Sequence, residues 1–130
     1  MNNTTPEPPL ILIIDEDQSF FSVLQIGLSS EGFDLIYAGN GKHAQACCED
    51  HIFSAIIAES SIPELDGIQF TQWLRSHSDK PIPVIMMSSR TDAETREAAD
   101  AAGVTQFLAK PVSYEAILMH LRKLTGIIDG

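Results

Sequence analysis

Four groups of polar residues directly follow short apolar runs, and together they form a set that could bind a cation or an anion. They are Asp15-Glu16-Asp17, Glu59, Ser88-Ser89 and Lys110, which precedes Pro111. Carboxylate oxygens are ligands for hard divalent cations. A hydroxyl and an ammonium group donate hydrogen bonds to anionic oxygen. One such group suits any solvated loop, but all four in equivalent positions predict a shared polar site.

The apolar runs predict the strands that would position this site. They cover residues Leu10–Ile14, Leu35–Ala38, Ala55–Ala58, Val84–Met87 and Phe107–Ala109. Each run is short and almost free of polar residues, which is typical of strands buried on both faces of a parallel sheet. The carboxyl ends of such strands share one edge, where ligands bind, so we expect the four polar groups to meet there.

Amphipathic segments alternate with these runs and predict five helices. We expect them over about residues 19–30, 41–49, 67–75 and 91–103 and in the stretch after Ser113. Asp17 is a candidate cap for the first helix and Ser113 for the last, while Thr91 and Glu94 suggest a capping box for the fourth. The spacing also predicts inward-facing Val23 and Ile68.

Five alternations of strand and helix predict a single α/β domain. Short, right-handed connections favour a doubly wound, flavodoxin-like, five-stranded parallel sheet with helices on both faces. We expect the strand order 2-1-3-4-5, although the pattern alone also fits other open orders.

Composition limits the function. Of the 130 residues, 44% are hydrophobic and 20% are charged, which fits one globular domain and not a disordered chain. The 18 acidic and 8 basic residues give a net charge of −10. Such a charge repels phosphate backbones and anionic lipid, so we expect no nucleic-acid partner within this chain and no membrane association.

Two further features predict the compartment. No apolar run approaches the roughly 20 residues of a membrane-spanning helix, and the first nine residues lack the basic charge of a secretory signal. The only cysteines, Cys47 and Cys48, are adjacent and cannot frame a disulfide scaffold. We therefore expect a reduced, cytoplasmic protein.

Five stretches of the chain resemble receiver domains of bacterial response regulators, in order and at the spacing of that family. They are Ile11-Leu12-Ile13-Ile14-Asp15-Glu16-Asp17; Ile56-Ile57-Ala58-Glu59 with Ile62-Pro63-Glu64-Leu65-Asp66-Gly67; Pro83-Val84-Ile85-Met86-Met87-Ser88-Ser89-Arg90; Ala101-Ala102-Gly103-Val104-Thr105-Gln106-Phe107-Leu108; and Ala109-Lys110-Pro111-Val112. The resemblance implies a receiver domain over residues 10–125, preceded by a flexible arm over 1–9. Residues 126–130 would form a tail or the start of a linker.

The resemblance also implies roles for the polar groups. Asp15 and Glu16 would bind magnesium, together with the carboxylate at position 59 and the backbone carbonyl of Ser61. In the family, an Asp at the position of Glu59 accepts a phosphoryl group from a histidine kinase.

Residues after the fourth strand and around the fifth would respond to activation. The resemblance implies that Ser88, with Ser89 beside it, contacts a phosphoryl oxygen and that Lys110 pairs with the carboxylate or phosphate. It further implies that the aromatic ring of Phe107 changes rotamer and that the bond to Pro111 is cis.

The sequence departs from the family at its centre, because Glu59 occupies the phosphoacceptor position and Asp66 comes several residues too late. One extra methylene displaces the carboxylate by about 1 Å, an error that can cost about 100-fold in rate. We expect slow or absent phosphorylation, and we expect the longer side chain to reach both Lys110 and Ser88. Glu59 would then imitate a phosphoryl group with one negative charge in place of nearly two. Magnesium binding would be weakened, because Glu16 and Glu59 alter the usual Asp geometry.

We therefore expect an atypical receiver domain that is not an enzyme and acts as a phosphorylation-independent interaction module in two-component phosphorelay signalling. Its partners would be signalling proteins, a histidine kinase or a downstream effector. They would dock on the fourth helix, fifth strand and fifth helix, a surface that offers Arg90, Arg96, Glu97, Phe107, Tyr114 and Arg122.

Two alternatives remain. One is a working phospho-receiver that accepts a phosphoryl group on Glu59 from a histidine kinase. The other is a flavin-binding, flavodoxin-like protein, which the acidic run at 15–17 disfavours because it would repel the flavin phosphate.

Overall fold

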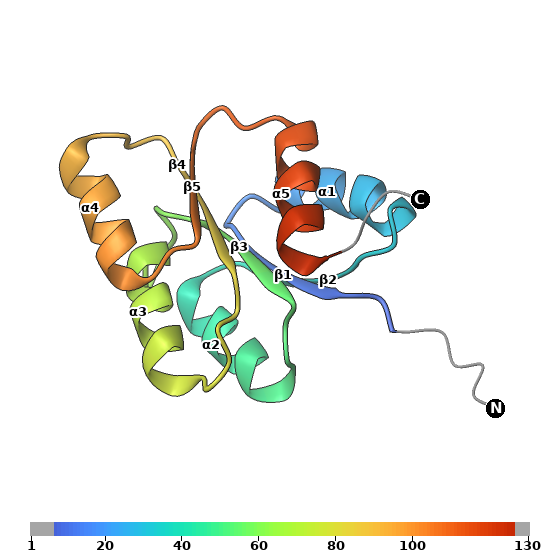
Figure 1. Cartoon of the computed structure of the whole chain (residues 1–130), viewed down its shortest axis with the longest axis horizontal. Helices are drawn as coiled ribbons and strands as arrows, with labels where there is room; N and C mark the ends of the chain where they lie inside the picture. Colours follow the sequence, from blue (N-terminus) through green and yellow to red (C-terminus); the bar gives the residue numbers. More distant parts are fainter. Residues whose placement is uncertain (1–6, 127–130) are drawn as a thin grey trace.

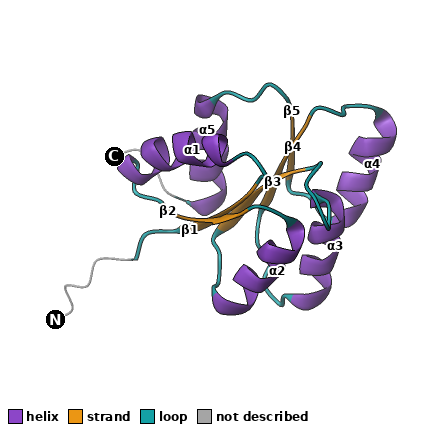
Figure 2. Ribbon diagram, turned by 180° about the vertical axis from the view of Figure 1, so that it is seen from behind, coloured by secondary structure: helices purple, strands orange, loops and turns teal. Residues whose placement is uncertain are grey.

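Five parallel strands form one sheet in the order β2-β1-β3-β4-β5 (Figures 1 and 2). The structure is a computed structural model, and it describes residues 7–126. The strands are β1 Leu10–Ile14, β2 Asp34–Ala38, β3 Ala55–Glu59, β4 Val84–Ser88 and β5 Gln106–Ala109. The helices are α1 Gln18–Ser30, α2 Gly41–Asp50, α3 Gly67–His77, α4 Ala93–Ala102 and α5 Tyr114–Thr125. The flavodoxin-like fold and strand order predicted from the sequence are confirmed.

Helices cover both faces of the sheet, with α1 and α5 on one side and α2, α3 and α4 on the other (Figure 2). Alternate residues of β1 point to opposite faces. Ile11 and Ile13 join the cluster that includes Leu24 of α1, whereas Leu12 and Ile14 join the cluster that includes α2 and α3. The four β1 residues are fully buried. Burial on both faces explains why the run at 10–14 contains no polar residue.

The parallel register brings the carboxyl ends of the strands to one edge. Ile14 at the end of β1 pairs with Ala58 of β3, and Glu59 pairs with Met87 of β4. Ser88 in turn pairs with Ala109, the last residue of β5. The polar residues at or directly after these positions therefore line a single edge.

The predicted caps are correct at two helices and wrong at a third. The Asp17 side chain accepts hydrogen bonds from the backbone N–H groups of Ser19 and Phe20, and Ser113 caps α5. At α4 the cap is Asp92, whose carboxylate accepts a hydrogen bond from the Thr95 N–H. The expected box of Thr91 and Glu94 is absent because the cap is one residue later than predicted, at Asp92.

Two residues expected to face inward do not. Val23 is 63% exposed because α1 buries Leu24 and Leu28, which follow the helical spacing of four. Ile68 is half-buried and lies beside the buried face of α3, which includes Phe70 and Leu74. Each predicted stripe was one residue too broad.

The chain ends are only partly described. Pro9, the last residue of the predicted arm, is attached to the sheet, since its carbonyl accepts a hydrogen bond from the Asp34 N–H at 3.0 Å. Gly126 caps α5 in the left-handed conformation, with φ 77°. The rest of the expected arm (1–6) and tail (127–130) lies outside the described residues. Between residues 7 and 126, no helix is long and apolar enough to cross a membrane.

Candidate functional site

Glu59 and Lys110 form an ion pair at the carboxyl edge of the sheet. Lys110 Nζ lies 2.7 Å from Glu59 Oε1, and the Ser60 backbone N–H donates to Glu59 Oε2 at 3.1 Å. The Glu59 side chain is 12% exposed and that of Lys110 is 34% exposed. Both carboxylate oxygens therefore have partners, and the expected contact between Glu59 and Lys110 is present.

Asp15 is the most buried carboxylate of the acidic run. Its exposed fraction is 5%, and its Oδ1 accepts a hydrogen bond from the Asp17 N–H at 2.9 Å. Burial raises the pKa of Asp15; the hydrogen bond from Asp17 and the charge of Lys110 oppose this, and the charge of Glu59 adds to it. The pKa of Asp15 therefore depends on the charges of both Lys110 and Glu59.

Ser88 is fully buried, but its hydroxyl is directed elsewhere than Glu59. Ser88 Oγ accepts hydrogen bonds from Ser60 Oγ at 2.8 Å and from the Arg90 N–H at 3.0 Å, and it donates to the Arg90 carbonyl at 3.0 Å. A hydroxyl can donate once and accept twice. The predicted contact between Glu59 and Ser88 is therefore wrong, because the serine already uses its full hydrogen-bonding capacity.

The chemistry of the carboxylates fits magnesium only in part. Asp15 offers a free oxygen, and Glu16 and Ser61 are exposed at the same edge. Glu59 is occupied on both oxygens, by Lys110 and by a backbone amide. Within the described part of the chain, no three His, Cys, Asp or Glu residues are placed to hold a metal ion.

The remaining predicted residues lie around Lys110. Phe107 is half-buried, and the guanidinium carbon of Arg96 lies 4.8 Å from the centroid of its ring, a cation–π distance. The bond between Lys110 and Pro111 is cis, as the resemblance implied. Ser89, the neighbour of Ser88, is exposed.

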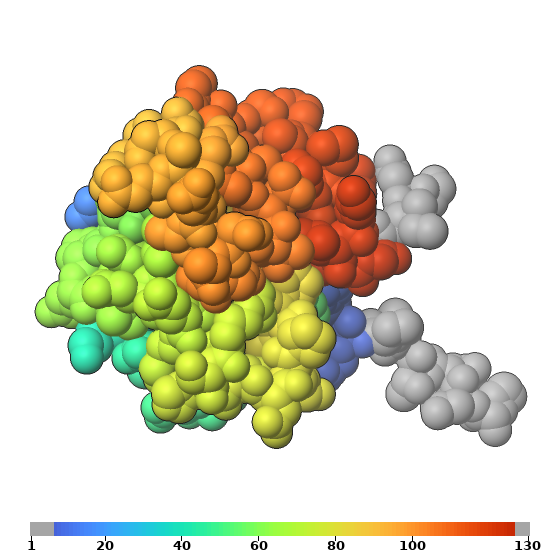
Figure 3. Space-filling view, turned by 60° about the vertical axis from the view of Figure 1, so that its left-hand side comes forward, coloured from blue at the N-terminus to red at the C-terminus, as the bar shows by residue number. Residues whose placement is uncertain are grey.

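The elements predicted to form the docking surface are neighbours, but two of the residues predicted for that surface pack against α1. Figure 3 shows α4, the region of β5 and α5 side by side on one face. Arg96 lies on this face with Phe107. Tyr114 instead packs against α1, where its ring occupies the space a side chain at Gly27 would need. Arg122 also turns to α1 and pairs with Glu31.

Sequence reasoning missed the structural role of Ser60. This serine is 8% exposed and joins Glu59 to Ser88 through its backbone and its hydroxyl, respectively. The strand register contained the signal. Glu59 pairs with Met87, so the residues that follow them, Ser60 and Ser88, are neighbours across β3 and β4.

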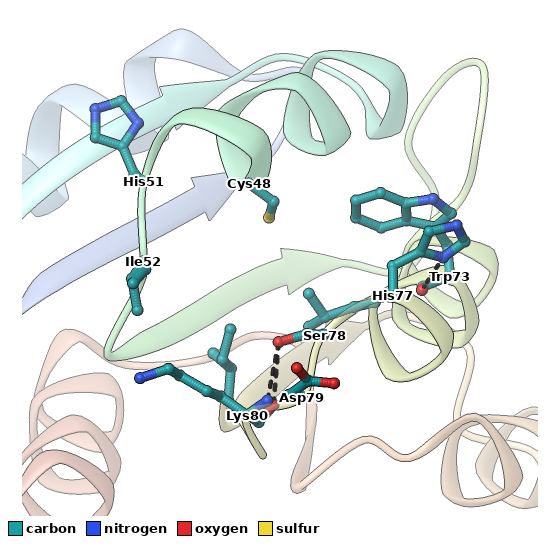
Figure 4. Close-up of a pocket in the computed structure, with 10 residues that line it drawn as sticks. Cys48, His51, Ile52, Trp73, His77, Ser78, Asp79 and Lys80 are labelled. Atoms are coloured by element: carbon teal, nitrogen blue, oxygen red, sulfur yellow. Dashed lines mark hydrogen bonds between the residues drawn. The ribbon is translucent and has the colours of Figure 1, made fainter.

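Two cavities lie near opposite edges of the sheet. One of about 210 Å³ lies beside the site and is lined by Ser60, Ser61, Asp66, Ile68, Arg90, Glu94, Thr95 and Ala98. Another of about 240 Å³ lies at the opposite, amino-terminal edge, between the ends of α2 and α3. Figure 4 shows Cys48 and Trp73 pointing into it, while the ring of His51 turns away. None of the predicted site residues lines this larger cavity.

Solved structures share this fold along most of the chain. The receiver domain of Francisella response regulator 1452 has a TM-score of 0.84 at 24% identity, covering 91% of this chain and 97% of that one. Chemotaxis protein CheY4 of Vibrio cholerae has a TM-score of 0.83 at 25% identity, covering 90% and 98%. The receiver domain of sensor histidine kinase PA1611 from Pseudomonas aeruginosa, solved with a magnesium ion in its active-site cleft, has a TM-score of 0.82 at 24% identity, covering 92% and 98%.

Sequence relatives and a family model agree with this likeness. The transcriptional regulatory protein SrrA of Staphylococcus aureus is 28% identical over 114 residues, which cover 88% of this chain and 46% of SrrA. The chain thus spans about half the length of the curated relatives it matches. The model of the response regulator receiver domain matches residues 11–122. The chain belongs to the family of response regulator receiver domains of two-component systems.

Proposed function

We propose that this receiver domain is a phosphorylation-independent interaction module and not an enzyme. The observation that carries the proposal is the ion pair of Glu59 and Lys110 at 2.7 Å. The glutamate carries its negative charge one methylene farther from the backbone than an aspartate would, and Lys110 is paired with it without any phosphoryl group. The domain then presents one fixed state of its site to a partner.

The surroundings of Glu59 also disfavour its use as a nucleophile. Lys110 Nζ bonds to Oε1 and the Ser60 N–H bonds to Oε2, and both contacts draw charge away from the oxygens that would attack a phosphorus atom. Phosphoryl transfer depends almost entirely on positioning and charge stabilisation. The side chain is also one methylene longer than that of Asp, which moves the attacking oxygen by about 1 Å.

Weakened magnesium binding is part of the same proposal. The positive charge of Lys110 beside Glu59 Oε1 opposes a cation there, and magnesium requires near-ideal octahedral geometry. The PA1611 receiver domain, which shares the fold, contains a magnesium ion in its active-site cleft, and this likeness supports a magnesium site in the present chain. Asp15 and Glu16 would be the side-chain ligands here, together with the Ser61 carbonyl.

The proposed partner is another protein of a two-component system, a histidine kinase or a downstream effector, bound at α4, β5 and α5. The presence of Arg96 and Phe107 on this face supports the assignment, because arginine and aromatic residues are enriched in protein interfaces. A cytoplasmic location remains a prediction.

The decisive experiment compares three proteins under one phosphodonor. The natural protein, Glu59→Asp and Glu59→Gln are incubated with acetyl phosphate and magnesium, and intact mass reports an added phosphoryl group. We expect the natural protein and the glutamine variant to remain unmodified and the aspartate variant to gain one group. Calorimetric titration with magnesium should show tighter binding by the aspartate variant.

A mass gain on the natural protein at the rate of the aspartate variant, lost in Glu59→Gln, would overturn the proposal. It would favour the alternative of a phospho-receiver that uses Glu59. If no protein is modified, a second phosphodonor, phosphoramidate, is used. Continued failure of the aspartate variant would show that the site lacks receiver chemistry for reasons other than the methylene, and would also contradict the proposal.

A further inference from the structure

We propose that Ser60 is a positioning residue that acts as a latch, holding the Ser88 hydroxyl away from Glu59. The inference rests on the proposed function in treating Glu59 as a permanent negative charge. It adds a reason why that charge does not attract the serine on the neighbouring strand. The latch would decide which of two hydrogen-bond arrangements the site adopts.

Ser60 holds both partners at once. Its backbone N–H is shared between the Met87 carbonyl at 2.9 Å and Glu59 Oε2 at 3.1 Å, and its hydroxyl donates to Ser88 Oγ at 2.8 Å. The backbone therefore orients the carboxylate, while the side chain orients the serine. A residue without a side-chain hydroxyl, such as alanine, would keep the first bond at this position and lose the second.

The bond between the two hydroxyls is protected from solvent. Ser60 is 8% exposed and Ser88 is fully buried, so water competes poorly for either oxygen. Hydrogen bonds are electrostatically stronger in such surroundings than in water. The Arg90 backbone completes the set by donating to Ser88 Oγ and accepting from it.

The second arrangement, in which Ser88 bonds to Glu59, is favoured by the charge of the carboxylate. If Ser88 turned, its hydroxyl could donate to the ionised carboxylate of Glu59, and bonds to a charged acceptor are about twice as strong as neutral ones. Glu59 pairs with Met87, so the register places Ser88 opposite Ser60, one residue along from Glu59 on the adjacent strand. Without the Ser60 hydroxyl, the present arrangement loses one of its three bonds.

Opening the latch would not leave buried polar groups without hydrogen-bond partners. Ser60 and Arg90 both line the cavity of about 210 Å³, and Arg90 is exposed. Solvent entering from this side can hydrate the groups that Ser88 releases. Loss of the Ser60 hydroxyl should therefore change the free-energy difference between the two arrangements by about the net contribution of one hydrogen bond. This corresponds to a shift of about twofold to tenfold in the ratio of their populations.

The test uses the full chain without any phosphodonor. Ser60→Ala removes the donor and Ser60→Thr keeps a hydroxyl. Ser61→Ala is the matched control, because Ser61 is an exposed serine at the next position. Nuclear magnetic resonance follows the Arg90 amide, which donates to Ser88 Oγ, and the Ser88 side-chain rotamer.

In Ser60→Ala we expect the Ser88 rotamer ratio to shift by about twofold to tenfold and the Arg90 amide signal to move upfield as its bond weakens. Ser60→Thr should restore the natural signals and Ser61→Ala should leave them unchanged. Adding Glu59→Gln to Ser60→Ala should reverse much of the shift, since the attracting charge is gone. A crystal structure of Ser60→Ala would locate the serine directly.

An unchanged Ser88 rotamer in Ser60→Ala would overturn the latch, and so would an equal shift in Ser61→Ala. Because no phosphodonor is present, either result leaves the proposed function standing. Conversely, phosphorylation of Glu59 in the earlier experiment would not affect the rotamer comparison. The two proposals can therefore fail separately.

Discussion

Lys110 Nζ lies 2.7 Å from Glu59 Oε1, although the two residues are 51 positions apart in the sequence. Glu59 ends β3 and Lys110 follows β5, and β4 lies between these strands in the sheet. The contact therefore spans the width of two strand spacings across the carboxyl edge. It ties the end of the third strand to that of the fifth.

The charges of this pair should move the pKa of Asp15 in opposite directions. Lys110→Met removes a charge that lowers this pKa, so the pKa should rise, whereas Glu59→Gln removes a charge that raises it, so the pKa should fall. Nuclear magnetic resonance titration of the Asp15 side-chain carbonyl measures both shifts. Lys123→Met, an exposed lysine on α5, is the control. Shifts of the same sign in the two site variants would contradict the electrostatic account.

Asp15 should also make stability depend on pH. Its pKa in the folded protein lies above the ordinary value of 3.8, chiefly because of burial, so the folded state binds its proton more tightly than the unfolded state does. Its contribution to the free energy of unfolding therefore falls as pH rises from 3.8 through the raised pKa and stays low above it.

Asp15→Asn should consequently be more stable than the natural protein at neutral pH and gain nothing below pH 3.8. Asparagine retains an oxygen that can accept the hydrogen bond from the Asp17 N–H. Urea unfolding at a series of pH values measures the difference. A gain that is equally large at the acid end would show that it does not come from ionisation of Asp15.

Gly67 should tolerate no side chain. A Cβ there would lie 2.5 Å from the Glu59 backbone oxygen and 3.1 Å from Met86 Cε, and the first of these contacts requires the backbone to move. Gly67→Ala should lower the free energy of unfolding by about 1–3 kcal/mol. Gly39→Ala, where the nearest atom is the Tyr37 hydroxyl at 3.4 Å, should cost much less. Urea unfolding compares the two, and equal losses would contradict the steric explanation.

Cys48 should react slowly with alkylating agents. Burial, with a smaller contribution from Cys47, raises the pKa of its thiol to about 11. The thiolate is the reactive form, so the rate should rise about tenfold per pH unit until the pH approaches that value. Mass spectrometry of iodoacetamide labelling in Cys47→Ser isolates the Cys48 thiol in its cavity (Figure 4). A labelling rate that stops rising near pH 9 would indicate an ordinary exposed thiol and contradict the raised pKa.

The sequence was sufficient for the fold and for the identity of most polar residues at the site. Strands buried on both faces leave unbroken apolar runs, so the run at 10–14 could be recognised without a structure. The residue that follows each run lies at the carboxyl edge in any parallel sheet, which is why Glu59 and Lys110 could be expected to meet. The stripes on α1 and α3 were less exact, because helical spacing alone does not distinguish Val23 from its neighbour Leu24 as the buried residue.

Side-chain partners were decided only by the tertiary structure. Ser88 was expected to contact Glu59, but a serine hydroxyl is short and bonds whichever groups the strand register places around it, here Ser60 and the Arg90 backbone. Tyr114 likewise turned to α1, because Gly27 leaves room for its ring. Apolar burial and strand direction are encoded along the chain as periodic patterns, whereas the choice of a hydrogen-bond partner depends on atoms brought together from distant segments, and no local pattern records it.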